Sequence, residues 1–358
     1  MKDLILNGAW LKRDKGLFYR ADIDDLRFFD NLDDLGRSSF SDKNYFIIIS
    51  YDLSGELLDL NIKKSGLPPV VLIELNDFKE IFPEPYPCRL SLKGSSLNDD
   101  DYKNSVLKIK ELIAEGTIYQ VNLTDRFDFE FDGTPESLFY RFHYSQPVPY
   151  SFYLNAGDFY IISGSMELFL EKEGSLIRSK PIKGTATTAH ALINSEKDRA
   201  ENLMITDMMR NDLGRIARNG TVRVTELFRI TEYQTLFQMH STVEAISDKE
   251  IVDILRATFP PASVTGAPKR KAVEIIESLE PHPRSYYCGC AGLLSPEHDF
   301  ILSVLIRTAI GNGKRLSYYA GCGIVWDSEP EKELSELYLK MKAFQSIEQR
   351  AAPSFLIA

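Results

Sequence analysis

Cysteine is scarce in this chain and long apolar runs are missing, and each scarcity excludes a class of protein. The four cysteines among 358 residues are too few and too scattered for the disulfide framework of a secreted domain. The Cys288-x-Cys290 spacing does not match a zinc motif. No stretch approaches the roughly 18 apolar residues of a membrane-spanning helix, and the N-terminus lacks the apolar core of a signal peptide. We therefore expect a cytoplasmic protein without a membrane anchor.

Positive charge is also in short supply, because 42 lysines and arginines face 52 aspartates and glutamates. The resulting net charge of −10 makes nucleic acid and anionic membranes poor partners for the chain as a whole. An acidic small molecule can still bind, but it then needs a local cation or a metal ion. With 44% hydrophobic residues the chain can bury a large core, as one big domain or two intimately joined ones.

Apolar patterning predicts helices and strands in no regular alternation. Strands are expected at 45–51, 119–132, 151–154, 159–163, 222–227, 287–294, 300–309 and 316–325. Helices are expected at about 98–116, 196–214, 268–279 and 330–350, and Ser263 or Thr265 is able to cap the third one. Residues 1–45 and the proline-rich stretch 65–95 are expected to be irregular. Because the order lacks a βαβ rhythm, we expect an α+β fold with large antiparallel or mixed sheets.

One lysine stands in a distinctive short run, Pro181-Ile182-Lys183-Gly184-Thr185, after a polar strand-like stretch at 175–180. The proline restrains the backbone and the glycine frees it, which suits a positioned amine. A lysine acts as a nucleophile once burial or nearby cations favour its neutral form. A solvated lysine in a surface loop is the ordinary alternative.

Three glutamates have the chemistry of metal ligands. Glu333 and Glu336 lie three residues apart on the expected last helix, and Lys340 shares their face. Glu201 lies on the expected helix 196–214. Carboxylates that meet from two helices would bind a hard cation such as Mg²⁺. A solvated Glu/Lys helix surface is the alternative for the last helix.

Glycine-rich and charged segments flank these helices. The glycines of Tyr319–Val325 let backbone N–H groups approach a ligand closely, or else permit a tight strand pair. The segment Ser263–Lys269 offers two hydroxyls at a helix N-terminus, which either favours a bound carboxylate or simply caps the helix. Arg307 interrupts an apolar strand, and a buried arginine needs a carboxylate from the protein or from a ligand.

Together these segments resemble the chorismate-binding enzyme family, which includes anthranilate synthase component I, aminodeoxychorismate synthase component I, isochorismate synthase and salicylate synthase. The similar segments occur in the family's order at Tyr119–Leu123, Ser165–Glu167, Pro181–Thr185, Asp198–Gly214, Ser263–Lys269, Ile306–Thr308, Gly321–Val325 and Glu333–Lys340. The resemblance implies an α+β fold like that of anthranilate synthase component I, with large antiparallel or mixed sheets packed as a sandwich and helices outside. We expect residues 1–95 to form a shortened N-terminal subdomain of this fold and residues 96–350 the chorismate-binding catalytic domain.

The resemblance also implies a role for each matching residue. Glu167 matches the acid that protonates the departing hydroxyl, and Lys183 the covalent nucleophile. Arg307 and the backbone around Gly323 match the group that holds the enolpyruvyl carboxylate. The matches to the Mg²⁺ ligands are Glu201, Glu333 and Glu336. Further substrate contacts are expected from Gly184, Thr185, Gln238, Thr265, Gly266 and Lys340.

Two positions favour one member of the family. Anthranilate synthases have alanine at the position of Lys183, whereas the lysine form resembles aminodeoxychorismate synthase component I. There the lysine is understood to attack C2 of chorismate and expel the C4 hydroxyl, after which ammonia adds at C4 and releases the lysine. Isochorismate and salicylate synthases have a basic lysine at the position of Gln120, which a glutamine cannot replace. We therefore expect synthesis of 4-amino-4-deoxychorismate, toward 4-aminobenzoate and folate. Anthranilate synthase component I is the alternative enzyme, and a chorismate-binding scaffold is the non-enzymatic alternative.

The expected partners are chorismate, ammonia and a separate glutaminase subunit, since the chain has no glutaminase-like cysteine motif. Three positions depart from the family's pattern. Met166 stands where relatives often have proline, and Pro261-Ala262 replaces a Gly-Gly pair. Many relatives have histidine at the position of Gln238, and whether His240 substitutes for it is left open by the sequence.

Overall fold

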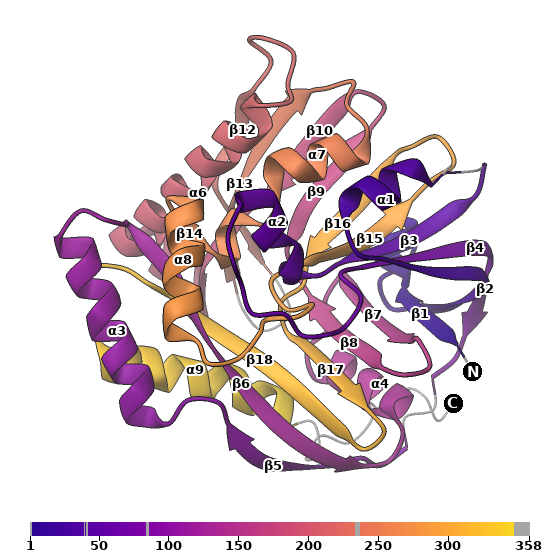
Figure 1. The fold of residues 1–358 in the computed structure, drawn as a ribbon, viewed down its shortest axis with the longest axis horizontal. Coiled ribbons are helices and arrows are strands. Elements are labelled where there is room, and N and C mark those ends of the chain that lie inside the picture. The colour runs from indigo at the N-terminus through magenta and orange to yellow at the C-terminus, as the bar shows by residue number, and fades with distance from the viewer. Residues whose placement is uncertain (1, 39, 41, 84–85, 233–236, 347–358) are drawn as a thin grey trace.

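The computed structural model describes residues 2–38, 40, 42–83, 86–232 and 237–346 (Figure 1). Its strands form one continuous sheet array. The first half of the array runs in the order β5 (Arg89–Ser95), β6 (Gln120–Asp132), β18 (Arg315–Ile324), β17 (Thr308–Asn312), β8 (Tyr160–Ser165) and β7 (Tyr150–Asn155). The second half runs β1 (Asp3–Asn7), β2 (Phe18–Phe29), β4 (Val70–Ile81), β3 (Asn44–Ile49), β15 (Cys290–Leu294), β16 (Phe300–Val304), β9 (Leu168–Glu173), β10 (Leu176–Lys180) and β13 (Phe237–Ile246).

The two halves are joined by the pairing of β1 with β7. Two further strands, β11 (Ile182–Ala186) and β12 (Arg223–Glu232), both pair with β13, and the short β14 (Gly266–Ala267) pairs with β6. Every pairing among the described residues is antiparallel. The expected α+β fold with a large sheet is thus confirmed. Of the two expected sheet types, antiparallel and mixed, the described residues form the antiparallel one.

A shared apolar core packs the two halves of the array face to face as a sandwich. Trp10 illustrates this, because its ring makes edge contacts with Phe46 of β3 and Phe152 of β7. On the other side of the core, Tyr287 stacks on Tyr319 of β18 with ring centroids 5.3 Å apart. These contacts bring strands from distant parts of the chain into one core.

Helices cover the outside of the sandwich, as expected (Figure 1). A second core lies under α3 (Asp99–Ala114), α4 (Pro135–Ser145), α8 (Lys269–Leu279) and α9 (Pro330–Gln345), on the outer face of β6 and β18. The long helix α6 (Glu196–Gly214) lies against β13, and α7 (Ile251–Thr258) lies beside it. The shorter helices are α1 (Leu32–Arg37), α2 (Ser54–Leu58) and α5 (Ala189–Ile193), with 3-10 turns η1 (Gly8–Leu11), η2 (Tyr51–Leu53) and η3 (Ala262–Val264). No helix within the described ranges is both long and apolar enough to cross a membrane.

Two expectations about irregular regions were wrong. Residues 1–45 hold β1, β2 and α1, and the stretch 65–95 holds β4 and β5. Acidic residues such as Asp22 and Asp24 favoured the prediction of a loop in place of β2. In the structure they lie at exposed positions of this strand, and the alternate residues Ala21 and Ile23 are buried or half-buried. The prolines that predict a long loop lie just before β4 and β5, where the strands have not yet begun.

The ends of two later elements also differ from expectation. Neither Ser263 nor Thr265 caps α8, whose N-cap is Pro268 without a side-chain hydrogen bond. The expected strand 300–309 is divided into β16 and β17, and Arg307 between them has a left-handed backbone with φ 49°. The last helix ends at Gln345, and the expected continuation to 350 lies largely outside the described residues.

Candidate active site

One large cavity of about 850 Å³ opens between the sandwich, α6 and α9. Most of the predicted site residues line it, although they come from seven separate segments of the chain. Those on its wall are Glu167, Lys183, Gly184, Thr185, Glu201, Gln238, Arg307, Gly323, Glu333, Glu336 and Lys340. A cavity that gathers most of the ionisable residues singled out from the sequence is the strongest candidate for an active site.

Two predicted substrate contacts do not reach this wall. Thr265 is fully buried, and its hydroxyl donates a hydrogen bond of 2.9 Å to the carbonyl oxygen of Pro261. Gly266 lies behind the cavity in β14, where a Cβ would come within 2.2 Å of the Gln120 carbonyl oxygen. Ser263 and Val264 line the cavity in their place, so both residues support the wall from behind.

Lys183 is held on the cavity wall by its own hydrogen bond. It lies on β11, and its Nζ donates to the carbonyl oxygen of Ser263 at 3.1 Å. Gly184 allows the strand to bend here, since its φ is +90° and a Cβ would lie 2.9 Å from Cβ of Asp198. Across the cavity, a Cβ on Gly323 would lie 3.6 Å from the lysine amine. The missing side chain of Gly323 thus leaves room beside the amine for a ligand.

Glu167 is buried at the turn between β8 and β9, and it lines the same cavity as Lys183. Burial raises the pKa of its carboxyl above the ordinary value, although the Ser263 side chain and the Lys183 charge act in the opposite direction. A carboxyl whose pKa is raised keeps its proton to higher pH. Glu167 therefore has the property that a general acid requires.

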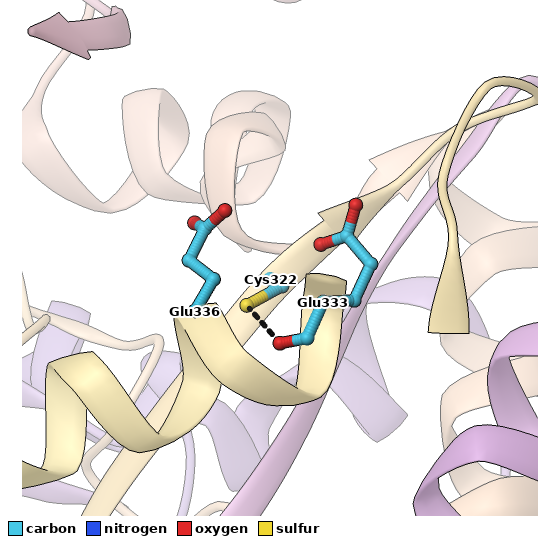
Figure 2. A group of neighbouring side chains, drawn as sticks. All are labelled: Cys322, Glu333 and Glu336. Atoms are coloured by element: carbon cyan, nitrogen blue, oxygen red, sulfur yellow. Dashed lines mark hydrogen bonds between the residues drawn. The ribbon is translucent and has the colours of Figure 1, made fainter. Parts of the chain in front are cut away.

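The paired glutamates of α9 point into the cavity from one side of the helix. Figure 2 shows Glu333 and Glu336 projecting together, with the thiol of Cys322 on β18 next to them. The ligand atoms of these three residues lie within 4.8 Å of one another. Burial raises the pKa of the Cys322 thiol to about 12, so it stays protonated and bonds the Glu333 carbonyl oxygen at 3.6 Å. The thiol is therefore a packing group, and the carboxylate oxygens are the donors suited to a hard cation.

Glu201 faces Glu333 from α6, on the opposite wall. Burial raises the pKa of Glu201, while the charges of Lys183 and Lys197 counteract part of the shift. Burial acts to raise the pKa of Glu336, but the charges of Lys340, 2.8 Å away, and of Lys197 and Lys183 together lower it. The three glutamates line one cavity from two helices, but Glu201 lies outside the group of ligand atoms within 4.8 Å that contains Glu333 and Glu336.

Lys197 is a cavity residue that the sequence reasoning missed. Its ammonium lies 4.0 Å from a carboxylate oxygen of Glu201 and 3.8 Å from one of Glu333. The spacing offered a signal, because Lys197 precedes Glu201 by four residues and so shares its helix face. Gln146 was also missed, and its sequence context gave no comparable signal.

Arg307 reaches the cavity without a carboxylate partner among the described residues. Its guanidinium donates to the side-chain oxygen of Gln146, and burial lowers its pKa from the ordinary value. The sequence left open whether a carboxylate of the protein or of a ligand pairs with Arg307. No protein carboxylate pairs with it in the described part of the chain. The guanidinium is left with donors for an anionic ligand.

Two further polar groups have unmet hydrogen-bonding capacity. The side-chain oxygen of Gln238 is buried on the cavity wall, and that of Gln120 is buried behind Gly323. Neither oxygen has a hydrogen-bond partner in the part of the chain that the structure describes. His240 does not line the cavity; its Nε2 lies 2.9 Å from the Thr231 hydroxyl, on the neighbouring strand β12. Gln238, and not His240, therefore faces the cavity from β13.

Comparison with known proteins agrees with this geometry. Residues 79–346 match the family described as chorismate binding enzyme. Aminodeoxychorismate synthase component 1 of Bacillus subtilis (strain 168) is 38% identical over 264 residues, which cover 70% of this chain and 56% of that protein. Anthranilate synthase component 1 of Aquifex aeolicus (strain VF5) is 37% identical over 261 residues, which cover 70% and 53%. The chain thus matches little more than half the length of these two relatives.

Solved structures confirm the fold. Anthranilate synthase component I from Streptococcus pneumoniae TIGR4 superposes with a TM-score of 0.77 at 24% identity, over 96% of this chain and 90% of that one. The menaquinone-specific isochorismate synthase from Escherichia coli gives a TM-score of 0.78 at 19% identity, over 98% and 89%. The chain therefore has the fold of anthranilate synthase component I, as expected.

Proposed function

The chain belongs to the chorismate-binding enzyme family, and from that premise we propose that it converts chorismate and ammonia to 4-amino-4-deoxychorismate. This is the reaction of aminodeoxychorismate synthase component I, an early step toward 4-aminobenzoate and folate. The observation that carries the proposal is the amine of Lys183, anchored at 3.1 Å to the Ser263 carbonyl on the cavity wall. Alanine at this position could supply no nucleophile.

The proposed reaction divides one substitution at C4 into two steps. Lys183 first gives its ammonium proton to water; its amine then attacks C2 of chorismate, the ring double bonds shift, and the C4 hydroxyl departs. Glu167 gives that hydroxyl its proton, so water leaves. Ammonia then forms a bond to C4, the double bonds shift back, the C2–nitrogen bond to Lys183 breaks, and the ionised Glu167 takes back the proton that the new C4 ammonium group loses. The covalent amine also keeps ammonia away from C2 during the reaction.

We assign substrate binding to side chains that bring N–H donors to the cavity. The guanidinium of Arg307, steadied by Gln146, would hold the enolpyruvyl carboxylate. Lys340 lies near the glutamates and would approach the ring carboxylate. Gly323 leaves space for the ring beside Lys183, and Gly184 lines the same cavity.

Magnesium is the proposed cofactor, and the donor set fits it. Glu333 and Glu336 of α9 hold their carboxylate oxygens within 4.8 Å of each other, and Glu201 of α6 lines the same cavity; carboxylate oxygens are the ligands that Mg²⁺ prefers. When bound there, the ion would neutralise these carboxylates and the ring carboxylate of the substrate together. In its absence, the lysines of the cavity offset part of the negative charge.

A glutamine amidotransferase subunit is the proposed source of ammonia. Both sequence relatives described above carry the name component 1. We propose that this chain likewise receives ammonia from a separate glutaminase. Turnover with ammonium but not with glutamine, followed by glutamine-dependent turnover once such a subunit is added, would support this.

Anthranilate synthase component I is the second candidate, because a relative with that name is almost as similar as the first. One experiment separates the two. The purified chain is incubated with chorismate, Mg²⁺ and ammonium at mildly alkaline pH, and the products are separated by mass. Aminodeoxychorismate without pyruvate supports the proposal. Anthranilate with pyruvate would overturn it and leave the family assignment intact.

A further inference from the structure

Lys197 places a cation between two of the proposed metal ligands. Its Nζ lies 4.0 Å from Oε1 of Glu201, one turn along α6, and 3.8 Å from Oε1 of Glu333 on α9. The two carboxylates have only 14% and 5% of their side chains exposed. Without a cation between them, two nearly buried negative charges would face each other across the cavity.

The ammonium of Lys197 is the least restrained of those near the glutamates. Lys183 donates to the carbonyl oxygen of Ser263 at 3.1 Å, and Lys340 to that of Gly321 at 2.7 Å. Within the described ranges, Lys197 donates no hydrogen bond, and 48% of its side chain is exposed. A long, flexible lysine at a cavity rim can move its ammonium into water with little loss.

A divalent cation held by the same two glutamates would need the space that Lys197 occupies, because like charges repel strongly at such distances. The carboxylate of Glu333 is held in place for either the Lys197 ammonium or a divalent cation. The hydroxyl of Ser328 donates to its Oε1 at 2.7 Å and keeps the carboxylate oriented whichever cation is present.

We propose that Lys197 is the resident counterion of the carboxylate site. It neutralises Glu201 and Glu333 while no metal is bound, and it moves out to solvent when a divalent cation enters. Lys197 thus stabilises the empty site and weakens metal affinity, because each binding event must displace it. The inference rests on the proposed function only in taking these glutamates as the metal ligands.

The test measures Mg²⁺ binding directly, by titration calorimetry without chorismate at fixed pH. We expect Lys197→Met to bind Mg²⁺ about tenfold more tightly than the wild type, since no ammonium has to be displaced. The same variant should lower the Tm of the metal-free protein by about 2 °C, because the glutamates lose their counterion. Saturating Mg²⁺ should remove this difference.

Lys332→Met is the matched control. Lys332 is the neighbour of Glu333 on α9, but it points outward and pairs with Glu329. Its removal changes the net charge equally, so its Mg²⁺ affinity should stay within about twofold of the wild type. A tenfold gain in both variants would indicate a general charge effect and would overturn the proposal.

Two other outcomes would also overturn the inference, and they have different meanings. If the wild type binds Mg²⁺ and Lys197→Met binds it equally or less tightly, the counterion role is wrong while the metal site stands. If Lys197→Met leaves Mg²⁺ affinity unchanged but weakens chorismate binding, the lysine is a substrate contact. A wild type that binds no Mg²⁺ would instead remove the metal ligands from the proposed function itself.

Discussion

Lys183 is anchored on Ser263, whose side chain also acts on Glu167. The lysine amine donates to the Ser263 carbonyl oxygen at 3.1 Å, and the Ser263 side chain lowers the pKa of the Glu167 carboxyl against the larger, opposite effect of burial. Ser263 lies 80 residues beyond the lysine, in the turn η3. The same short turn therefore lies beside both groups. This arrangement suits a nucleophile and an acid that act on the same substrate.

Lys183→Ala should abolish or strongly slow ammonia addition at C4, because the covalent step loses its amine. Chorismate affinity should change little, since the substrate carboxylates are assigned to other residues. Rapid-quench assays give the rate, and equilibrium titration gives the affinity. Lys180→Ala is the control, as Lys180 lies on the neighbouring strand β10 outside the cavity. Unchanged turnover in Lys183→Ala would exclude the covalent mechanism.

Glu167→Gln should reduce kcat by about 100-fold or more, because the departing hydroxyl loses its proton donor. Burial raises the pKa of Glu167, so the wild type should keep its active, protonated form to higher pH than an exposed glutamate would. As pH rises through that pKa, wild-type activity should fall, and the variant should lack this limb of the profile. Glu171→Gln on β9, outside the cavity, should leave rate and profile unchanged. An identical pH profile in Glu167→Gln would assign the proton to another group.

Glu201→Gln should stabilise the metal-free protein while removing its response to Mg²⁺. Burial raises the pKa of Glu201 in the folded state, so ionising it costs folding free energy. The stabilisation that this group provides in its protonated form, below its unfolded pKa of about 4.3, is lost as pH rises through the folded pKa. The variant should therefore gain about 0.5–2 kcal/mol in free energy of unfolding near neutral pH. This gain should shrink toward about pH 4.

Denaturant titrations at several pH values, with and without Mg²⁺, measure both effects of Glu201→Gln. Glu196→Gln, at the exposed start of α6, is the control and should show neither. A loss of stability in Glu201→Gln at neutral pH would mean that the carboxylate is a net stabilising group in the folded chain.

Gly184→Ala should destabilise the protein by more than about 1 kcal/mol and lower turnover, because the strain falls beside Lys183. The backbone has φ +90°, and the new Cβ would lie 2.9 Å from Cβ of Asp198. Gly157→Ala is the control that separates the strain of a positive φ from the steric contact with Asp198. Gly157 has φ +100° with open space around it. It should show the conformational cost without a loss of activity. Equal activity losses in both variants would contradict a local role for Gly184.

Local sequence patterns were sufficient for the elements whose residues carry their own signal. The Asn/Asp run at 98–101 and the apolar spacing that follows predicted α3. The predicted range 196–214 coincides with α6. Helical spacing also placed Glu333 and Glu336 on one face, because side chains three residues apart on a helix are neighbours. The order of the motifs identified the family without any three-dimensional information.

Other features depended on contacts between distant segments. The strand β2 was missed because its charged residues are compatible with a loop until β1 and β4 pair with it on either side. Thr265 was expected at the cavity, but only the packing of β14 on β6 decides that it faces inward. The partner of Arg307 was likewise left open, since Gln146 lies 161 residues earlier.

The sequence by itself determined the fold class, the family and the chemical identity of the candidate nucleophile, acid and metal ligands, because these reside in residue types and short spacings. Only the tertiary structure decided which of these groups meet. The distance between charges governs their energy, and Lys197 comes within 4 Å of Glu333 only because α6 and α9 flank the same cavity. Helix periodicity links Lys197 to Glu201 but carries no information about Glu333, more than a hundred residues away. The counterion at the carboxylate site is therefore a property of the fold.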